Sequence, residues 1–132
     1  MLEKYLAHHH DVDVAPDTYL YAGGVTTFQS LWMGVPTLTL PGDLIANRGA
    51  PLVLSHAGLN GFIAADQDDF VAKGTAWAGK IDELAQIRSG MRERCMQSPS
   101  FDPYRVPAAL SSGIRKMWRR WCAGQVSETF DA

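Results

Sequence analysis

The stretch from Ala22 to Pro36, AGGVTTFQSLWMGVP, constrains the fold of this chain more than any other. It predicts a glycine turn, a short helix at 27–33 and a stop, because glycine suits the residue after a helix and proline cannot continue one. Short alternating or apolar segments at 11–15 and 36–40 flank it and are predicted to be strands. Strands that alternate with helices predict an α/β fold with a parallel sheet.

The start of this stretch suits the binding of an anion. Gly23 and Gly24 allow a tight turn with positive φ, and Thr26 and Gln29 have the spacing of a capping box. Backbone N–H groups at a helix start attract groups such as phosphate. Thr26 and Thr27 could hold a diphosphate through their hydroxyls and N–H groups, or Thr26 could only cap the helix. The residues alone leave both interpretations open.

The rest of the chain predicts one more strand and several helices. Residues 1–10 are polar and helical in pattern, and an apolar segment at 61–64 is a third short strand. Pro51 fits the helix expected at 46–56 only in its first turn. Asp66 is expected to cap the next helix, which buries Phe70, Val71, Trp77 and Ala78; the following helix has an apolar stripe of Ile81, Leu84, Ile87, Met91 and Cys95. Asp102 and Pro103 are then expected to begin a last helix with Leu110, Ile114, Met117, Trp118 and Trp121 on one face.

The composition indicates one soluble domain. The chain has 132 residues and a net charge of −2, which gives no electrostatic signature of a nucleic-acid or membrane partner. Cys95 and Cys122 form no disulfide framework, so a reducing, cytoplasmic setting is expected. No apolar run approaches the roughly 18 residues of a membrane span.

Four other features have a structural interpretation that the residues favour over a functional one. Gln29 could contact ribose hydroxyls, but it completes the capping-box pattern. Asp11 and Asp13 resemble the metal motif of some sugar transferases, yet no third ligand supports it. The histidines at 8–10 are expected to be a solvated helix end, since adjacent positions do not converge on a metal. The basic run at 115–120 fits the wet face of an amphipathic helix better than a nucleic-acid site.

The segments DTYLYAGGVTTFQSLWMGVP at 17–36 and TLPGD at 39–43 closely resemble the carboxyl-terminal region of bacterial SPINDLY-type, tetratricopeptide-linked protein O-linked N-acetylglucosamine transferases. The resemblance covers nearly the whole chain in the same order. It continues through ANR at 46–48, AGL at 57–59, RER at 92–94, SPSFD at 98–102 and MWRRWCAG at 117–124.

The resemblance implies a GT-B glycosyltransferase, in which two Rossmann-like domains face each other. Residues 1–124 would be the carboxyl-terminal part of the second domain, ending in a long helix, and 125–132 a disordered tail. The family transfers N-acetylglucosamine from UDP-GlcNAc to protein Ser or Thr hydroxyls without a metal or other cofactor. The positions that bind the nucleotide in the family correspond here to two sets of residues. The diphosphate would contact Gly23, Gly24, Val25, Thr26 and Thr27, and the ribose would contact Gln29. No catalytic residue is assigned.

The sequence departs from the family pattern at several of these positions. The family has Asn at Ala22, Asp or Glu at Gln29 and His at Tyr5, and a His–Thr pair or a third Thr across Gly24 and Val25. The resemblance therefore leaves an alternative, a non-catalytic nucleotide-binding or protein-interaction module that self-associates through a sheet edge or the terminal helix. A GT-B enzyme that uses another nucleotide is a third interpretation.

The protein acceptor would bind through upstream regions of the protein. The chain by itself is therefore expected to be inactive, and the residues leave open whether it is an enzyme alone.

Overall fold

The computed structural model describes residues 2–18 and 21–130, and it divides into two compact units, Met1–Ser100 and Phe101–Ala132. The predicted boundary at residue 124 is not tested by this division. Of the predicted disordered tail, residues 131 and 132 lie outside the described residues.

The first unit is built on a parallel pair of strands, β1 (Ala15–Pro16) and β2 (Thr37–Leu38). The N–H of Ala15 donates to the carbonyl of Pro36 at 3.0 Å, and the N–H of Asp17 donates to that of Leu38 at 2.8 Å. Alternate residues of a strand donate to the same neighbour, so Pro16 sits where no N–H is required. The parallel pairing is confirmed, but both strands are shorter than predicted and β1 does not end before its proline.

The third strand predicted at 61–64 is wrong. A 3-10 helix, η3 (Asn60–Phe62), occupies its first half, and only Ile63 pairs with Thr39 in an isolated parallel bridge. The carbonyl of Phe62 accepts from the N–H of Thr39 at 3.0 Å, and the N–H of Ala64 donates to the carbonyl of Thr39 at 2.8 Å. The segment therefore pairs with the end of β2 through a single β-bridge.

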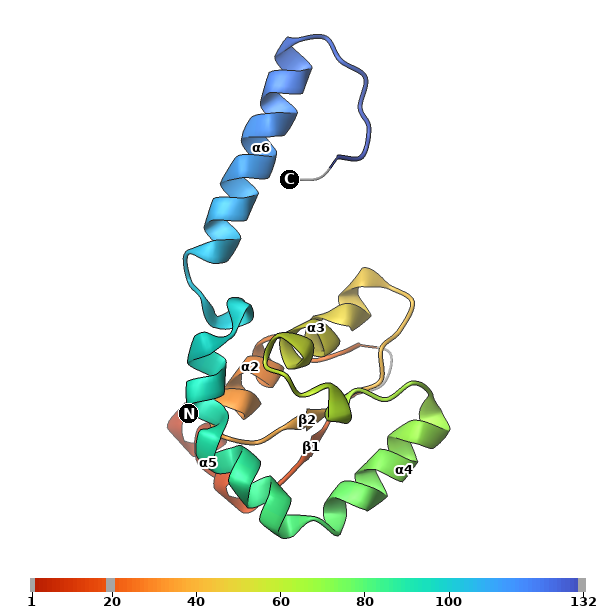
Figure 1. The fold of residues 1–132 in the computed structure, drawn as a ribbon, viewed down its shortest axis with the longest axis vertical. Helices are drawn as coiled ribbons and strands as arrows, with labels where there is room; N and C mark the ends of the chain where they lie inside the picture. The colour runs from red at the N-terminus through yellow and green to blue at the C-terminus, as the bar shows by residue number, and fades with distance from the viewer. Residues whose placement is uncertain (1, 19–20, 131–132) are drawn as a thin grey trace. The chain divides into compact units, whose positions relative to one another are not determined.

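Helices pack on both sides of β1 and β2, with α2 on one side and α4 on the other (Figure 1). Leu38 points to α4, where its Cδ2 lies 3.4 Å from the position that a Cβ would take on Gly74. Leu31, Leu54, Phe62 and Met91 are among the fully buried side chains of this core. The helices are α1 (Leu2–Ala7), η1 (His8–Asp11), α2 (Val25–Trp32), η2 (Ile45–Arg48), α3 (Gly49–His56), α4 (Gln67–Ala78), α5 (Ile81–Gln97) and η4 (Pro99–Phe101).

The starts and ends of several of these helices follow the signals in the sequence. Gly34 ends α2 with φ +86°, and the N–H of Val35 donates to the carbonyl of Ser30 at 2.8 Å, the long bond of a Schellman motif. Pro51 lies in the first turn of α3, where its missing N–H costs no helix bond. Asp66 caps α4 by accepting from the N–H of Asp69 at 2.8 Å.

The predicted buried faces are only partly correct. On α5, Leu84, Met91 and Cys95 of the predicted stripe are buried, whereas Ile87 is half-buried and Ile81 is exposed. On α4, Val71 and Ala78 are exposed, whereas Phe70 and Trp77 are half-buried and Trp77 stacks on Phe62 with ring centroids 4.3 Å apart. The helix α4 therefore covers the sheet with fewer side chains than its apolar pattern predicts.

Arg88 on α5 ties together the segments that lead into the first strand and out of α2. Its guanidinium donates to the carbonyls of His9, at 3.2 and 3.3 Å, of Met33, at 3.5 Å, and of Val12. We expect Arg88→Ala to lower the free energy of unfolding by about 3 kcal/mol, because several carbonyls lose a charged donor. Urea denaturation measures this loss. Arg48→Ala is the matched control, since exposed Arg48 makes one 3.4 Å bond to the carbonyl of Asp43, and an equal loss in both variants would contradict the prediction.

The two cysteines differ sharply in environment. Cys95 is fully buried, and desolvation raises the pKa of its thiol to about 11, whereas Cys122 is exposed. Because the thiolate is the reactive form, we expect an alkylating reagent near neutral pH to modify Cys122 alone in the native protein and both thiols in denaturant. Mass spectrometry after digestion assigns the sites. Rapid native labelling of Cys95 would contradict the described packing of α5.

The second unit consists of α6 (Arg105–Cys122) and the segment that follows it. The helix begins two residues later than predicted, because Asp102 accepts from the N–H of Tyr104 in a turn before the helix rather than capping it. The apolar side chains Leu110, Ile114, Met117, Trp118 and Trp121 are all exposed. Self-association through this helix stays a prediction. Within the described residues, no helix combines the length and apolarity needed to cross a membrane.

Candidate functional site

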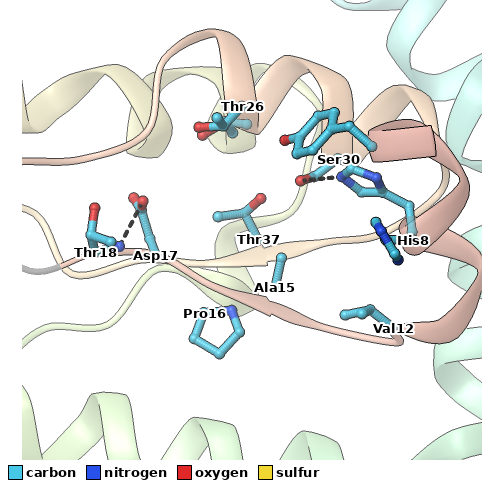
Figure 2. A pocket seen from close by; sticks show the side chains of 12 residues that line it. His8, Val12, Ala15, Pro16, Asp17, Thr18, Thr26, Ser30 and Thr37 are labelled. Carbon is cyan, nitrogen blue, oxygen red and sulfur yellow. Dashed lines mark hydrogen bonds between the residues drawn. The ribbon is translucent and has the colours of Figure 1, made fainter. Parts of the chain in front are cut away.

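A cleft of about 420 Å³ opens beside α2 (Figure 2). It is formed by α1 and η1, by β1 with the two residues that follow it, by the face of α2 that begins at Thr26, and by Thr37 of β2. We call it the α2 cleft. Its lining residues are Tyr5, His8, His9, Val12, Ala15, Pro16, Asp17, Thr18, Thr26, Thr27, Ser30 and Thr37.

Asp17 organises the loop between β1 and α2. Its Oδ1 accepts from the N–H of Gly23 at 2.8 Å and of Thr18 at 2.9 Å, and its Oδ2 accepts from the hydroxyl of Thr39 at 2.8 Å. One carboxylate thus joins the ends of both strands to the glycine turn. The sequence interpretation missed this role, although an aspartate directly after a strand and before a glycine turn is a signal that could have indicated it.

Neither glycine of the turn has positive φ, and only Gly23 is required for its small size. Among the described residues, positive φ at glycine occurs at 34, 58 and 124, so Gly23 and Gly24 do not use the positive φ that they allow. A Cβ on Gly23 would lie 2.6 Å from Thr26 Oγ1 and 2.8 Å from Thr27 Oγ1, whereas one on Gly24 would have no neighbour within 4 Å. Gly23 is therefore the glycine that the packing requires.

The helix α2 starts earlier than predicted and has no side-chain cap. Its N-cap residue is Gly24, and the carbonyl of Gly24 already accepts from the N–H of Phe28 at 3.3 Å. The capping box of Thr26 and Gln29 is therefore wrong, because both residues lie inside the helix. With no capping side chain, the N–H groups of residues 25–27 are available to a bound anion, and the positive end of the helix dipole favours it.

The two threonines of the loop have different surroundings. Thr27 is 2% exposed, and its hydroxyl donates to the carbonyl of Gly23 at 3.0 Å, so its proton holds the loop rather than a ligand. Thr26 is exposed, and Figure 2 shows its hydroxyl at the edge of the cleft, across from Asp17. Thr26 is thus the predicted site residue whose side chain is best placed to contact a ligand.

The other predicted site residues do not line the cleft. Val25 is exposed and Gln29 is half-buried, and neither lies in the cleft wall, which contains Ser30 instead. Asn47 and the glycine turn's Ala22 line a separate hollow of about 400 Å³ at the same edge of the sheet. The structure therefore brings Thr26 and Thr27 together with Ser30, a residue that the sequence did not indicate.

The histidine run is not a uniformly solvated helix end. His9 is 9% exposed: its Nδ1 lies 3.2 Å from the carbonyl of Leu6 and its Nε2 3.3 Å from Ser30 Oγ, and the ring of Tyr5 packs edge-on against it at 5.2 Å. His8 is exposed and lines the cleft. The prediction of a solvated helix end is therefore wrong for His9, because Ser30 packs against it. Nothing in the sequence indicated this contact.

The aspartates at 11 and 13 do not form the strand pair considered above. Asp11 ends η1, and Asp13 lies in a bend before β1, so a shared strand face does not exist. The Asp13 carboxylate instead lies 3.9 Å from the guanidinium of Arg88. Across residues 2–18 and 21–130, no group of three or more His, Cys, Asp or Glu side chains is placed to hold a metal ion.

Comparisons with known proteins agree on one family. The model of Glycosyl transferase family 41 matches residues 3–109. The probable UDP-N-acetylglucosamine--peptide N-acetylglucosaminyltransferase SPINDLY of Solanum lycopersicum is 35% identical over 115 residues, which cover 87% of this chain and 12% of that protein. The probable UDP-N-acetylglucosamine--peptide N-acetylglucosaminyltransferase SEC of Arabidopsis thaliana is 32% identical over 119 residues, which cover 89% of this chain and 12% of that protein.

The solved structures confirm the fold class. A mutant of the Thermobaculum terrenum O-GlcNAc transferase superposes with a TM-score of 0.80 at 31% identity, over 92% of this chain and 23% of that chain. The α/β fold expected from the alternation of strands and helices, and from the resemblance, is therefore confirmed. The chain spans 12% of the length of the curated relatives named above.

Proposed function

Because this chain belongs to glycosyl transferase family 41, we propose that it holds the diphosphate of a uridine diphosphate sugar. The observation that carries the proposal is the uncapped start of α2, which Asp17 fixes beside an open cleft. The residues involved are Gly23, Gly24, Val25, Thr26 and Thr27. The N–H groups of Val25, Thr26 and Thr27 and the helix dipole would stabilise charge on the departing nucleotide, while the N–H of Gly23 donates to Asp17 and holds the turn.

The reaction proposed for the whole protein is transfer of N-acetylglucosamine from UDP-GlcNAc to protein Ser or Thr hydroxyls. The names of the tomato and Arabidopsis relatives state a UDP-N-acetylglucosamine donor and a peptide acceptor. A cytoplasmic setting belongs to the same proposal, supported by the two free cysteines. Because the chain spans 12% of these relatives, acceptor binding is assigned to none of its residues.

Titration of the 132-residue chain with uridine diphosphate, followed by NMR, tests the proposal. We expect the amide signals of residues 23–27 to shift on binding. Thr26→Ala should weaken binding about ten- to hundredfold, because one hydrogen bond to a charged group is lost. Thr75→Ala is the matched control, since Thr75 is exposed on α4 and bonds only to the carbonyl of Val71 at 2.9 Å.

Two outcomes would decide against the proposal. No binding at about millimolar uridine diphosphate would favour the alternative, a module of this family that has lost its ligand. Tighter binding of guanosine diphosphate would favour a transferase that uses another nucleotide.

A further inference from the structure

A buried pair of side chains, His9 and Ser30, forms the inner wall of the α2 cleft. The two side chains come from η1 and α2, and His9 Nε2 lies 3.3 Å from Ser30 Oγ (the dashed line at Ser30 in Figure 2). Ser30 is 6% exposed, and both residues line the cleft. A polar pair this deeply placed in a cleft wall is expected to have defined hydrogen-bond directions.

The tautomer of His9 follows from its partners. The carbonyl of Leu6 can only accept, so Nδ1, at 3.2 Å, must carry the proton of the neutral ring. Nε2 is then an acceptor, and the hydroxyl proton of Ser30 must point to it. Ser30 therefore offers only its lone pairs to the cleft, which makes it an acceptor for a ligand's O–H or N–H.

A second hydroxyl in the same cleft has incomplete hydrogen bonding. Thr37 is 4% exposed, and its Oγ1 is buried without a hydrogen-bond partner in the part of the chain that the structure describes. Figure 2 shows this oxygen pointing from β2 toward α2. Ser30 as acceptor and Thr37 as donor together match a ligand hydroxyl, which both donates and accepts.

The position along α2 indicates which part of a nucleotide reaches this pair. Ser30 lies four residues after Thr26, about 6 Å farther along the helix. The proposed diphosphate occupies the start of α2, and the ribose is the group bonded directly to it. We propose that Ser30, oriented by His9, accepts a hydrogen bond from a ribose hydroxyl of the bound nucleotide. This inference rests on the proposed function and replaces Gln29, which lies outside the cleft wall, as the residue that recognises the ribose.

Calorimetric titration of the full chain with uridine diphosphate and its 2′-deoxy and 3′-deoxy analogues tests this proposal. One of the two analogues should bind about five- to tenfold more weakly than uridine diphosphate, as expected for one lost hydrogen bond. In Ser30→Ala, that difference should shrink to less than about twofold. Ser89→Ala, an exposed serine on α5, is the matched control and should keep the full difference.

His9→Phe separates orientation from contact, because it leaves Ser30 in place without its acceptor. It should weaken uridine diphosphate binding, and the double variant with Ser30→Ala should be no weaker than Ser30→Ala alone. Additive losses would overturn the orienting role.

Equal binding of all three nucleotides by the unaltered chain would overturn the proposal without any variant, so misfolding cannot obscure the result. Loss of the ribose preference in Gln29→Ala, but not in Ser30→Ala, would overturn it as well. Complete absence of uridine diphosphate binding would instead overturn the proposed function, and this inference with it.

Discussion

Replacing Asp17 by alanine is expected to lower the free energy of unfolding by about 3 kcal/mol and to abolish detectable binding of uridine diphosphate. The carboxylate accepts three hydrogen bonds, from the N–H groups of Gly23 and Thr18 and from the hydroxyl of Thr39. Hydrogen bonds to a charged acceptor are stronger than neutral ones, and Thr39 is 0% exposed, so its hydroxyl would be left buried without its acceptor. Without Asp17, Gly23 also loses the bond that fixes the turn before α2.

Urea denaturation and calorimetric titration measure the two effects separately. Asp17→Asn should lose about 1 kcal/mol, because its amide oxygen can still accept from the two N–H groups while the Thr39 hydroxyl turns to accept. Asp68→Ala is the control, since Asp68 is an exposed carboxylate in the first turn of α4. If Asp17→Ala were as stable as Asp68→Ala, the carboxylate would not be what holds the loop.

The parts of the fold that could be predicted depend on short-range chemistry. Gly34 takes positive φ at the end of α2, Pro51 fits the first turn of α3, and Asp66 caps α4 through a residue three positions away. Each signal needs only the backbone of its own turn. The parallel pairing of β1 and β2 was also predictable, because a helix between two strands imposes it.

The parts that could not be predicted depend on bonds between residues distant in sequence. Thr26 was expected to cap a helix that in fact begins one residue before it, because Asp17 fixes Gly23 from six positions away. His9 packs against Ser30, which lies 21 residues later in the sequence, as well as against its neighbours Tyr5 and Leu6. The bond between His9 and Ser30 has no pattern that a single sequence reveals, whereas an aspartate before a glycine turn could have indicated the bond between Asp17 and Gly23.

For the candidate site, the glycine turn at the start of α2 could be predicted, but the side chains that form the wall of the α2 cleft could not. The glycine turn and Thr26 were identified from residue types and from the resemblance, and their role in binding stays a prediction. Ser30 carries no motif by itself, and it joins the cleft through the packing of α2 on the strands, whereas Asp17 lies in the cleft because it directly follows β1. Gln29 shows the converse, because the resemblance assigned it to the ribose although it lies outside the cleft wall.

Gly23→Ala is expected to weaken uridine diphosphate binding at least tenfold and to destabilise the chain by about 1–3 kcal/mol. The added methyl would lie 2.6 Å from Thr26 Oγ1, 2.8 Å from Thr27 Oγ1 and 3.1 Å from Asp17 Oδ1. Asp17 precedes the glycine turn and the two threonines lie in the first turn of α2, so relief of one contact must move a residue that shapes the site. Among the three, Thr27 is the least free to move, because its hydroxyl donates a hydrogen bond to the carbonyl of Gly23 itself.

Two other glycines make the test specific. Gly24→Ala should cost less than about 1 kcal/mol, since its methyl would meet nothing within 4 Å and the loss is that of a helix N-cap preference. Gly90→Ala, in the middle of α5 with open space around it, should instead stabilise the chain by about 0.5–1 kcal/mol and leave binding unchanged. Chemical denaturation and the same titration rank the three variants. Equal effects of alanine at Gly23 and Gly24 would mean that backbone freedom, rather than the close approach of Thr26, Thr27 and Asp17, explains the glycine turn.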